Sequence, residues 1–335
     1  MKRRDFISII AGLPFAGAAL GQETTLRARV ETLLLQAGAL EALETVIVTR
    51  DGELVAERGY RDNSLEGSTN IKSASKSIVS CLVGIAIDRG LLSGVDQPIE
   101  TVLRPEFPQN ADPRLSKITV GHLLSMQSGL ERMSGPNYGR WVASRNWVRT
   151  ALAAGFVDDP GGGMLYSTAS THLLSVILAK VGRRPTLALA RDWLGPLEGF
   201  RIGSWDRDPQ GYYFGGNQMA MTPRSLHAFG ELYRRRGVTA DGTRLVSERW
   251  IDESWTRRTN SVFNGDGYGY GWFLKRMAGE QVNYAWGYGG QMLYIVPGLG
   301  LTVVMTSSES APSARTGYRD DLHRLLDGII LATAA

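Results

Sequence analysis

A serine and a lysine lie three residues apart where a long apolar segment begins. Ser73 and Lys76 open this segment, which continues without a charged residue to Ile87. Positions i and i+3 share one face of a helix, so the Lys76 amine can reach the Ser73 hydroxyl. A serine hydroxyl is a weak nucleophile until a neighbour takes its proton. Burial in an apolar helix disfavours the charged ammonium, so Lys76 could serve as that base near neutral pH.

Two other interpretations of this short pattern stay open. The serine and lysine could simply be solvated at a helix start, or a buried Lys76 could pair with a carboxylate. The apolar segment ends at Asp88–Gly90, where a glycine supplies a typical helix stop. A helix with so few charges is typically buried, which favours a functional lysine over a solvated one.

The composition fits a globular protein of one large or two interleaved domains. The chain has 335 residues, of which 43% are apolar and 21% are charged. Its formal charge is +4, and Lys2, Arg3 and Arg4, less Asp5, contribute +2 of this. The remaining charge is too small and too scattered to indicate a nucleic-acid partner.

Cysteine and histidine usage argues against disulfides and metals. The sole cysteine, Cys81, has no partner within the chain and lies in the apolar segment, where packing is its expected role. The four histidines show no metal-ligand spacing: His122, His172, His227 and His323. We therefore expect neither a metal nor another cofactor.

The first 21 residues have the order of an export signal. Basic residues precede an apolar stretch through Leu20, and small residues follow near Ala18–Gly21, where we expect cleavage. Arg3 and Arg4 resemble a twin-arginine signal, which predicts the twin-arginine export machinery as a partner and a periplasmic or secreted mature protein. An uncleaved anchor is the alternative, but the stretch is short for a membrane span, so no stable anchor is expected after cleavage.

Strand-like patterns lie near both ends of the chain and helical patterns lie between them. A hairpin is predicted around Asp51 and Gly52, and late strands are predicted at 270–274, 282–285, 292–296 and 301–306. Helices are predicted at 25–40, 120–126, 147–154, 171–181, 223–235, 247–255 and 318–331. This order indicates an α+β fold in which the two chain ends form one antiparallel sheet. The sheet part would cover about 22–72 and 260–335, with an inserted, mainly helical part at about 73–259 and a groove between them.

Two further segments place chemically useful residues beside glycines. Asp159–Thr168 is a glycine-rich turn that delivers Tyr166 and two hydroxyls just before a predicted helix. Trp286–Gln291 lies between two late strands, where missing side chains let a ligand approach the backbone. Taken alone, each could be an ordinary turn.

In this order, the three segments resemble the serine beta-lactamase and penicillin-recognising superfamily. The resemblance covers roughly residues 40 to 310 and points to the class C-like branch, with the family VIII carboxylesterases and the 6-aminohexanoate-oligomer hydrolases. The segment 122–130 is similar to the family's H-L-L-[ST]-x-x-S-G-L, 221–226 to M-T-P-x-D-L, and 268–272 to Y-G-x-G-W. The resemblance implies a beta-lactamase-like fold in which antiparallel strands from both chain ends are flanked by helices.

The resemblance also implies a set of catalytic roles. Ser73 would carry the acyl group, Lys76 and Tyr166 would share the proton transfers, and the oxyanion would meet the N–H of Ser73. A second N–H would come from the segment Gly289, Gly290 and Gln291, whose register is uncertain by one residue. A nearby Lys76 ammonium would favour the phenolate form of Tyr166, which predicts an ionisable pair.

Two departures from the family pattern concern substrate choice. Thr168 stands where the family's Y-x-N has asparagine, and Tyr288 with two glycines replaces its K-T-G or H-T-G. The cation that would hold the carboxylate of a beta-lactam is therefore missing from that strand, although Arg140 or Arg224 could supply one. Thr168 and Tyr288 are candidate substrate-binding residues.

The loop after Gly129 adds two aromatic candidates. Tyr138 and Trp141 lie where related enzymes build a wall of the substrate groove. Equally, these aromatics could pack beneath a long loop.

Together these observations predict an exported serine hydrolase that cleaves a small-molecule ester or amide through an acyl-enzyme on Ser73. A beta-lactamase or D-alanyl-D-alanine peptidase is the rival enzyme. A penicillin-binding-like receptor without turnover is the rival from another class, but it has no need to retain serine, lysine and tyrosine together.

Overall fold

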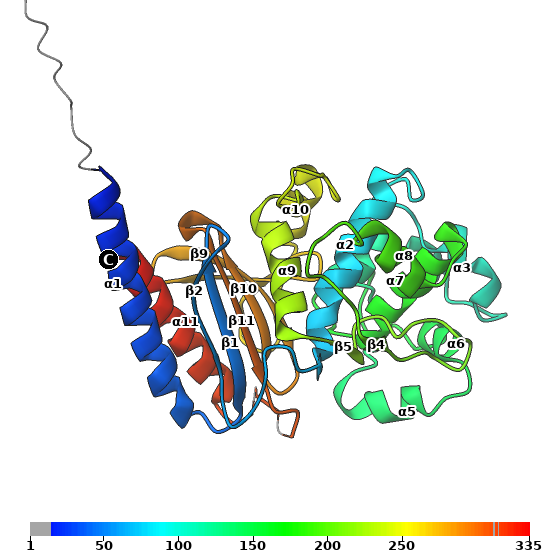
Figure 1. Cartoon of the computed structure of the whole chain (residues 1–335). Coiled ribbons are helices and arrows are strands. Elements are labelled where there is room, and N and C mark those ends of the chain that lie inside the picture. Colours follow the sequence, from blue (N-terminus) through cyan, green and yellow to red (C-terminus); the bar gives the residue numbers. More distant parts are fainter. Residues whose placement is uncertain (1–14, 311, 314) are drawn as a thin grey trace, which may run out of the picture.

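The fold is built on an eight-stranded antiparallel sheet (Figure 1). The computed structural model describes residues 15–310, 312–313 and 315–335, with side chains described from Thr25 onward. The strand order is β2-β1-β11-β10-β9-β8-β7-β6. The strands are β1 (Leu43–Arg50), β2 (Glu53–Gly59), β6 (Thr259–Asn260), β7 (Gly267–Tyr268), β8 (Phe273–Met277), β9 (Glu280–Gly287), β10 (Gln291–Val296) and β11 (Leu301–Ser307).

Strands from the two ends of the chain pair with each other near one edge of this sheet. β1 and β2 form the predicted hairpin, and β1 pairs with β11 so that Val46 lies opposite Met305. Helices α1 (Phe15–Gln36) and α11 (Tyr318–Ala334) cover one face of the sheet (Figure 1). The apolar side chains between them, such as Val30 and Ile330, are fully buried. The predicted α+β class and antiparallel sheet are therefore confirmed.

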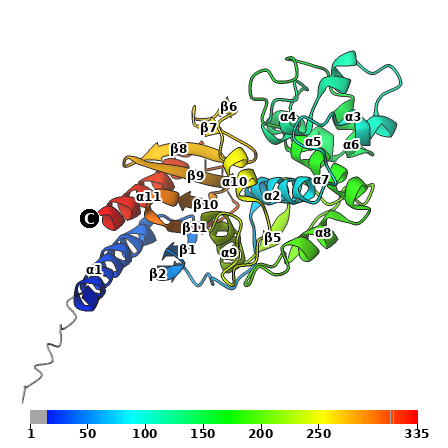
Figure 2. The same cartoon turned by 90° about the horizontal axis from the view of Figure 1, so that it is seen from above.

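The middle of the chain forms helices beside the other face (Figure 2). The helices are α2 (Ser75–Asp88), α3 (Glu100–Leu103), α4 (Val120–Leu124), α5 (Tyr138–Val142), α6 (Trp147–Leu152), α7 (Thr168–Gly182), α8 (Thr186–Trp193), α9 (Pro223–Arg234) and α10 (Glu248–Ser254). A small sheet of β3 (Thr69–Asn70), β5 (Met219–Met221) and β4 (Ser204–Trp205) lies among them. Helix α9 packs on β10 and β11, so it belongs to the sheet layer. The proposed domain boundaries stay a prediction.

Helix α2 is fastened to the sheet by two buried hydroxyls. Ser77 Oγ donates to the Gly271 carbonyl at 2.6 Å, and Ser80 Oγ donates to the Tyr270 carbonyl at 2.7 Å. The carbonyls belong to the turn that precedes β8. This turn has a positive φ of 79° at Gly271, so the strand predicted at 270–274 begins later than expected, at Phe273, and runs to Met277.

Other differences concern the ends of elements and the N-terminal segment. Ser73 lies in a 3-10 turn, Lys72–Ala74, and the α-helix starts only at Ser75. The helix predicted from residue 171 begins at Thr168, and the helix predicted to reach residue 40 ends at Gln36. The predicted signal, residues 1–21, lies outside the part whose side chains are described. From Phe15 onward, the described helices include none with the length and apolarity to cross a membrane.

Candidate active site

The 3-10 turn that carries Ser73 leads directly into α2, which brings Ser73 and Lys76 together as the sequence predicted. Lys76 Nζ donates to Ser73 Oγ at 3.1 Å. Ser73 is partly accessible, whereas Lys76 is only 2% exposed. The nucleophile candidate therefore faces the surface, and its partner is held behind it in the protein interior.

Lys76 is surrounded by neutral oxygen atoms. In addition to Ser73, it donates to the carbonyl of Gly216 at 2.6 Å and to Thr168 Oγ1 at 3.4 Å. These partners are uncharged, so the alternative in which Lys76 pairs with a carboxylate is not the arrangement found. Burial lowers the pKa of Lys76 to about 7, because the charged ammonium loses its hydration. Near neutral pH a large fraction of the amine is therefore unprotonated and able to accept a proton.

Tyr166 completes the cluster from the other side. Its ring centroid lies 5.2 Å from Lys76 Nζ, and its side chain is buried. Burial raises the pKa of Tyr166 to about 12, and a hydrogen bond with Ser73 acts in the opposite direction. The predicted phenolate is therefore wrong for the resting site. The ammonium that was to stabilise it is itself disfavoured by burial, so Tyr166 remains a proton donor.

A loop in the helical part supplies the closest partner of Lys76. Gly216 has a φ of 80°, and a Cβ at this position would lie 2.9 Å from Lys76 Nζ. The carbonyl can approach the amine because this residue has no side chain. The next residue, Asn217, donates from Nδ2 to the hydroxyl of Tyr138 at 2.8 Å. We did not predict Gly216 from the sequence, although the pair Gly215–Gly216 was a signal for close backbone approach.

The first turn of α7 holds the hydroxyl beside Lys76. Thr168 is the first residue of this helix, and its backbone N–H donates to Ser134 Oγ at 2.9 Å. The hydroxyls of Thr168 and Ser134 lie 3.1 Å apart. Thr168 thus occupies the family's asparagine position and still contacts the lysine. Ser134 was not predicted, because nothing nearby in the sequence marks it.

The glycine turn between β9 and β10 lies against the nucleophile turn. A Cβ on Gly287 would lie 2.2 Å from the Ile71 carbonyl, so the two backbones are in direct contact. The Gly290 N–H donates to the Gly287 carbonyl at 3.1 Å and is therefore already used. The side chain of Gln291 is fully buried and bonded to the backbone of Ser307.

These contacts reduce the number of groups in the segment 289–291 that could donate the second hydrogen bond to the oxyanion. The N–H of Gly290 and the amide side chain of Gln291 are engaged elsewhere, so we no longer assign them to the oxyanion. Gly289 packs against the Ser308 carbonyl, which a Cβ there would approach to 2.5 Å. The backbone N–H of Gln291, at the start of the strand that contacts the nucleophile turn, stays the predicted second donor.

The remaining candidates divide into surface and core residues. Tyr288 is 49% exposed on the glycine turn, and Tyr138 is partly exposed and stacks on Phe214. Trp141 has no exposed surface and packs against Trp147, with its Nε1 donating to the Trp147 carbonyl at 3.0 Å. Its proposed role in substrate binding is therefore wrong, and the packing interpretation holds for this residue.

The cluster contains the parts of an acyl-transfer site. A partly accessible hydroxyl lies beside a buried amine that can take its proton, and a protonated phenol can supply one to a leaving group. From residue 25 onward, the described side chains include no group of three His, Cys, Asp or Glu that could hold a metal ion.

Comparison with known proteins agrees with this geometry. The family described as Beta-lactamase matches residues 36–327. The chain belongs to the beta-lactamase family. We therefore describe it as a serine hydrolase of the beta-lactamase fold.

The individual relatives of this chain have low sequence identity to it. The 6-aminohexanoate-dimer hydrolase of Paenarthrobacter ureafaciens is 24% identical over 326 residues, which cover 85% of this chain and 79% of the relative. Among solved structures, EstCE1, a hydrolase with promiscuous acyltransferase activity, has a TM-score of 0.73 and 19% sequence identity. The match covers 93% of this chain and 99% of the EstCE1 chain. The D-amino acid amidase of Ochrobactrum anthropi SV3 has a TM-score of 0.73 and 16% identity, with 92% and 98% coverage. These two structures share the fold.

The two shifted pKa values predict the pH dependence of turnover. Lys76 accepts a proton only as the free amine, so kcat/KM for a neutral ester should fall as pH drops below the lysine pKa of about 7. Tyr166 donates only while protonated, so no decline is expected on the alkaline side until pH nears about 12 or the protein unfolds. Initial rates across pH, corrected for spontaneous hydrolysis and with folding followed by circular dichroism, measure this. An acid limb near about pH 4, where carboxylates titrate, would contradict the assignment of the base.

Proposed function

We propose that this hydrolase cleaves a carboxylic ester or small amide through a covalent acyl-enzyme on Ser73. The observation that carries the proposal is the buried Lys76 amine, 3.1 Å from the Ser73 hydroxyl and with its pKa lowered to about 7. A lysine in this state is costly to bury and contributes most where it accepts a proton. A receptor that merely binds a ligand has no use for it.

Acylation begins with attack by Ser73. Its oxygen forms a bond to the substrate carbonyl carbon while its proton passes to Lys76 Nζ. The carbonyl oxygen becomes an oxyanion, for which the N–H groups of Ser73 and Gln291 are the proposed donors. The Gly216 carbonyl and the Thr168 hydroxyl accept hydrogen bonds from the ammonium that forms, so they stabilise its charge in a dry environment.

Release of the leaving group uses the tyrosine. As the bond from carbon to the leaving oxygen or nitrogen breaks, the Tyr166 hydroxyl donates its proton to that atom, and Lys76 returns a proton to Tyr166. Water then attacks the acyl carbon while the free amine of Lys76 again accepts a proton. Lys76 passes this proton to Ser73 Oγ as the bond from the acyl carbon to Oγ breaks, which releases the product acid and restores the free amine. The two groups take complementary roles, because burial lowers the pKa of the base Lys76 and raises the pKa of the proton donor Tyr166.

Charge around the nucleophile favours a neutral substrate over a beta-lactam. Lys72 forms an ion pair with Glu309 and donates to Gln218 Oε1 at 3.3 Å, so its charge is already compensated. Arg224, one of the two arginines considered as substitutes, is bound to Glu57 and Glu66. The other, Arg140, pairs with Glu131 at 3.5 Å. A beta-lactam carboxylate would have to displace one of these partners.

Replacing the nucleophile tests the acyl-enzyme directly. Ser73→Ala should abolish turnover of a short-chain nitrophenyl ester and labelling by a fluorophosphonate, because the hydroxyl is the proposed point of attachment. Ser93→Ala is the control, since Ser93 is an exposed serine in the loop after α2 and contacts none of the site residues. Mass spectrometry of the wild-type adduct should place the phosphonate on Ser73. An adduct on Ser75 or Ser167 would identify a different nucleophile, and labelling without turnover would favour a receptor.

Substrate preference is the second test of the proposal. For the wild-type enzyme, kcat/KM should be at least about tenfold higher for the ester than for a chromogenic cephalosporin, which corresponds to about 1.4 kcal/mol of transition-state discrimination. Both reactions are measured on one preparation. Efficient cephalosporin turnover with negligible ester cleavage would reverse the assignment.

We also propose that the enzyme is exported by the twin-arginine route, on the basis of Arg3, Arg4 and the apolar residues that follow. Replacing both arginines by lysine keeps the positive charge and should leave the unprocessed precursor in the cytoplasm. Fractionation and the N-terminal sequence of the mature protein measure the outcome. A double variant that is still processed and exported would indicate the general secretory route.

A further inference from the structure

Two partly exposed aromatic rings adjoin Tyr166 in series. The ring of Phe263 meets the Tyr166 ring edge-on, with centroids 5.2 Å apart. Trp286 in turn contacts Phe263, with a centroid distance of 5.9 Å. Phe263 is 44% exposed and Trp286 is partly exposed, so both rings present area to a bound molecule.

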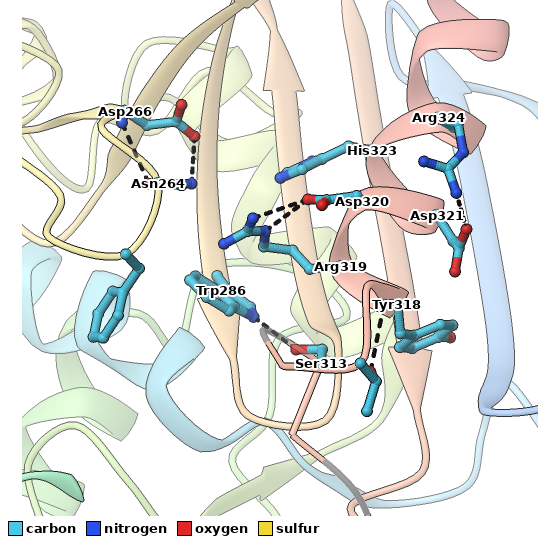
Figure 3. Close-up of polar contacts among 12 residues, drawn as sticks. Asn264, Asp266, Trp286, Ser313, Tyr318, Arg319, Asp320, Asp321, His323 and Arg324 are labelled. Carbon is cyan, nitrogen blue, oxygen red and sulfur yellow. Dashed lines mark hydrogen bonds and ion pairs between the residues drawn. The ribbon is translucent and has the colours of Figure 1, made fainter.

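Phe263 is held in its exposed position by the loop that carries it. Its N–H donates to Ser261 Oγ at 3.2 Å. The next residue, Asn264, donates from Nδ2 to Asp266 at 2.7 Å (Figure 3). It also donates to the hydroxyl of Tyr284 on β9 at 3.1 Å. The loop is thereby tied to the sheet, and the phenyl ring is fixed beside Tyr166.

Trp286 is fixed from the opposite side. Its Nε1 donates to Ser313 Oγ at 3.1 Å, and the Arg319 guanidinium lies 5.2 Å from its ring centroid (Figure 3). Phe273 packs beneath this tryptophan and beneath Tyr166, with centroid distances of 5.6 and 6.3 Å. Fixed, partly exposed aromatic rings lose little conformational entropy when a ligand covers them, which suits them to binding.

The chemistry of the proposed function determines which part of a substrate reaches these rings. Tyr166 must come within hydrogen-bond distance of the leaving atom to protonate it. The group attached to that atom then extends past the phenol, toward the ring that Tyr166 contacts. The acyl group, in contrast, stays bonded to Ser73 after the leaving group has departed.

We propose that Phe263 and Trp286 form the leaving-group subsite, so the enzyme prefers substrates whose alcohol or amine is aromatic or bulky and apolar. This inference rests on the proposed acyl-enzyme mechanism and deepens it by naming the side of the substrate that the site selects. Aromatic rings pack on one another in offset or edge-on arrangements, as the rings of Tyr166 and Phe263 already do.

Two esters of the same acid test the subsite. Benzyl acetate and ethyl acetate share the acyl group, so a difference between them reports on the leaving group. Phe263→Ala should lower kcat/KM for benzyl acetate about tenfold and change that for ethyl acetate less than about twofold. Leu54→Ala is the matched control, because Leu54 is 43% exposed on the β1–β2 hairpin, and it should leave both rates unchanged.

The outcomes separate this inference from the function on which it rests. An equal loss for both esters in Phe263→Ala would show that the ring acts only by positioning Tyr166, and would overturn the inference alone. Faster wild-type hydrolysis of ethyl phenylacetate than of benzyl acetate would place the aromatic subsite on the acyl side, which also overturns it. Hydrolysis of neither ester together with efficient cephalosporin turnover would overturn the proposed function itself.

Discussion

The desolvation of one amine is the constraint on which the site depends. Lys76 is almost completely enclosed, and its ammonium form has lost most of its hydration. Water could screen this charge if the amine were more open, and the pKa would return toward the usual range near 10.4. The lysine can therefore act as a base near neutral pH only while the surrounding helices remain packed.

Several separate parts of the chain contribute to that enclosure. Helix α2 carries Lys76, helix α7 supplies Thr168, and the loop before β5 supplies the Gly216 carbonyl. The turn before β8 closes the remaining side, because Gly271 lies against the backbone of Lys76 and accepts a hydrogen bond from Ser77. Segments from the helical part and from the sheet thus meet at one side chain. Changes far from Ser73 that loosen these contacts would act through the pKa of the lysine.

The sequence was most informative where spacing within one element determined geometry. Ser73 and Lys76 lie one helical turn apart, so their contact followed from the chain itself. Gly216 and Ser134 escaped prediction because their positions depend on how distant loops fold onto α2 and α7. Trp141 was ambiguous for a similar reason: an aromatic residue in a loop gives no sign of its burial, and here tertiary packing enclosed it completely. The predicted phenolate of Tyr166 was wrong because burial raises the pKa of the phenol and also disfavours the Lys76 ammonium that would have stabilised the phenolate.

The opposite pKa shifts of Lys76 and Tyr166 also explain how one site can both take a proton from Ser73 and give a proton to the leaving group. At neutral pH the lysine is poised between its two protonation states, whereas the phenol keeps its proton. A proton taken from Ser73 therefore has a defined direction of travel, from the amine to the phenol and then to the departing group. The reverse assignment, with a phenolate base and a permanently charged lysine, would require this enclosed site to stabilise two ions in the resting enzyme. The partners of Lys76 are neutral, so no fixed charge compensates an ion in the resting site. A site in which Lys76 is charged only transiently, during the catalytic cycle, is therefore less costly than one that holds two ions at rest.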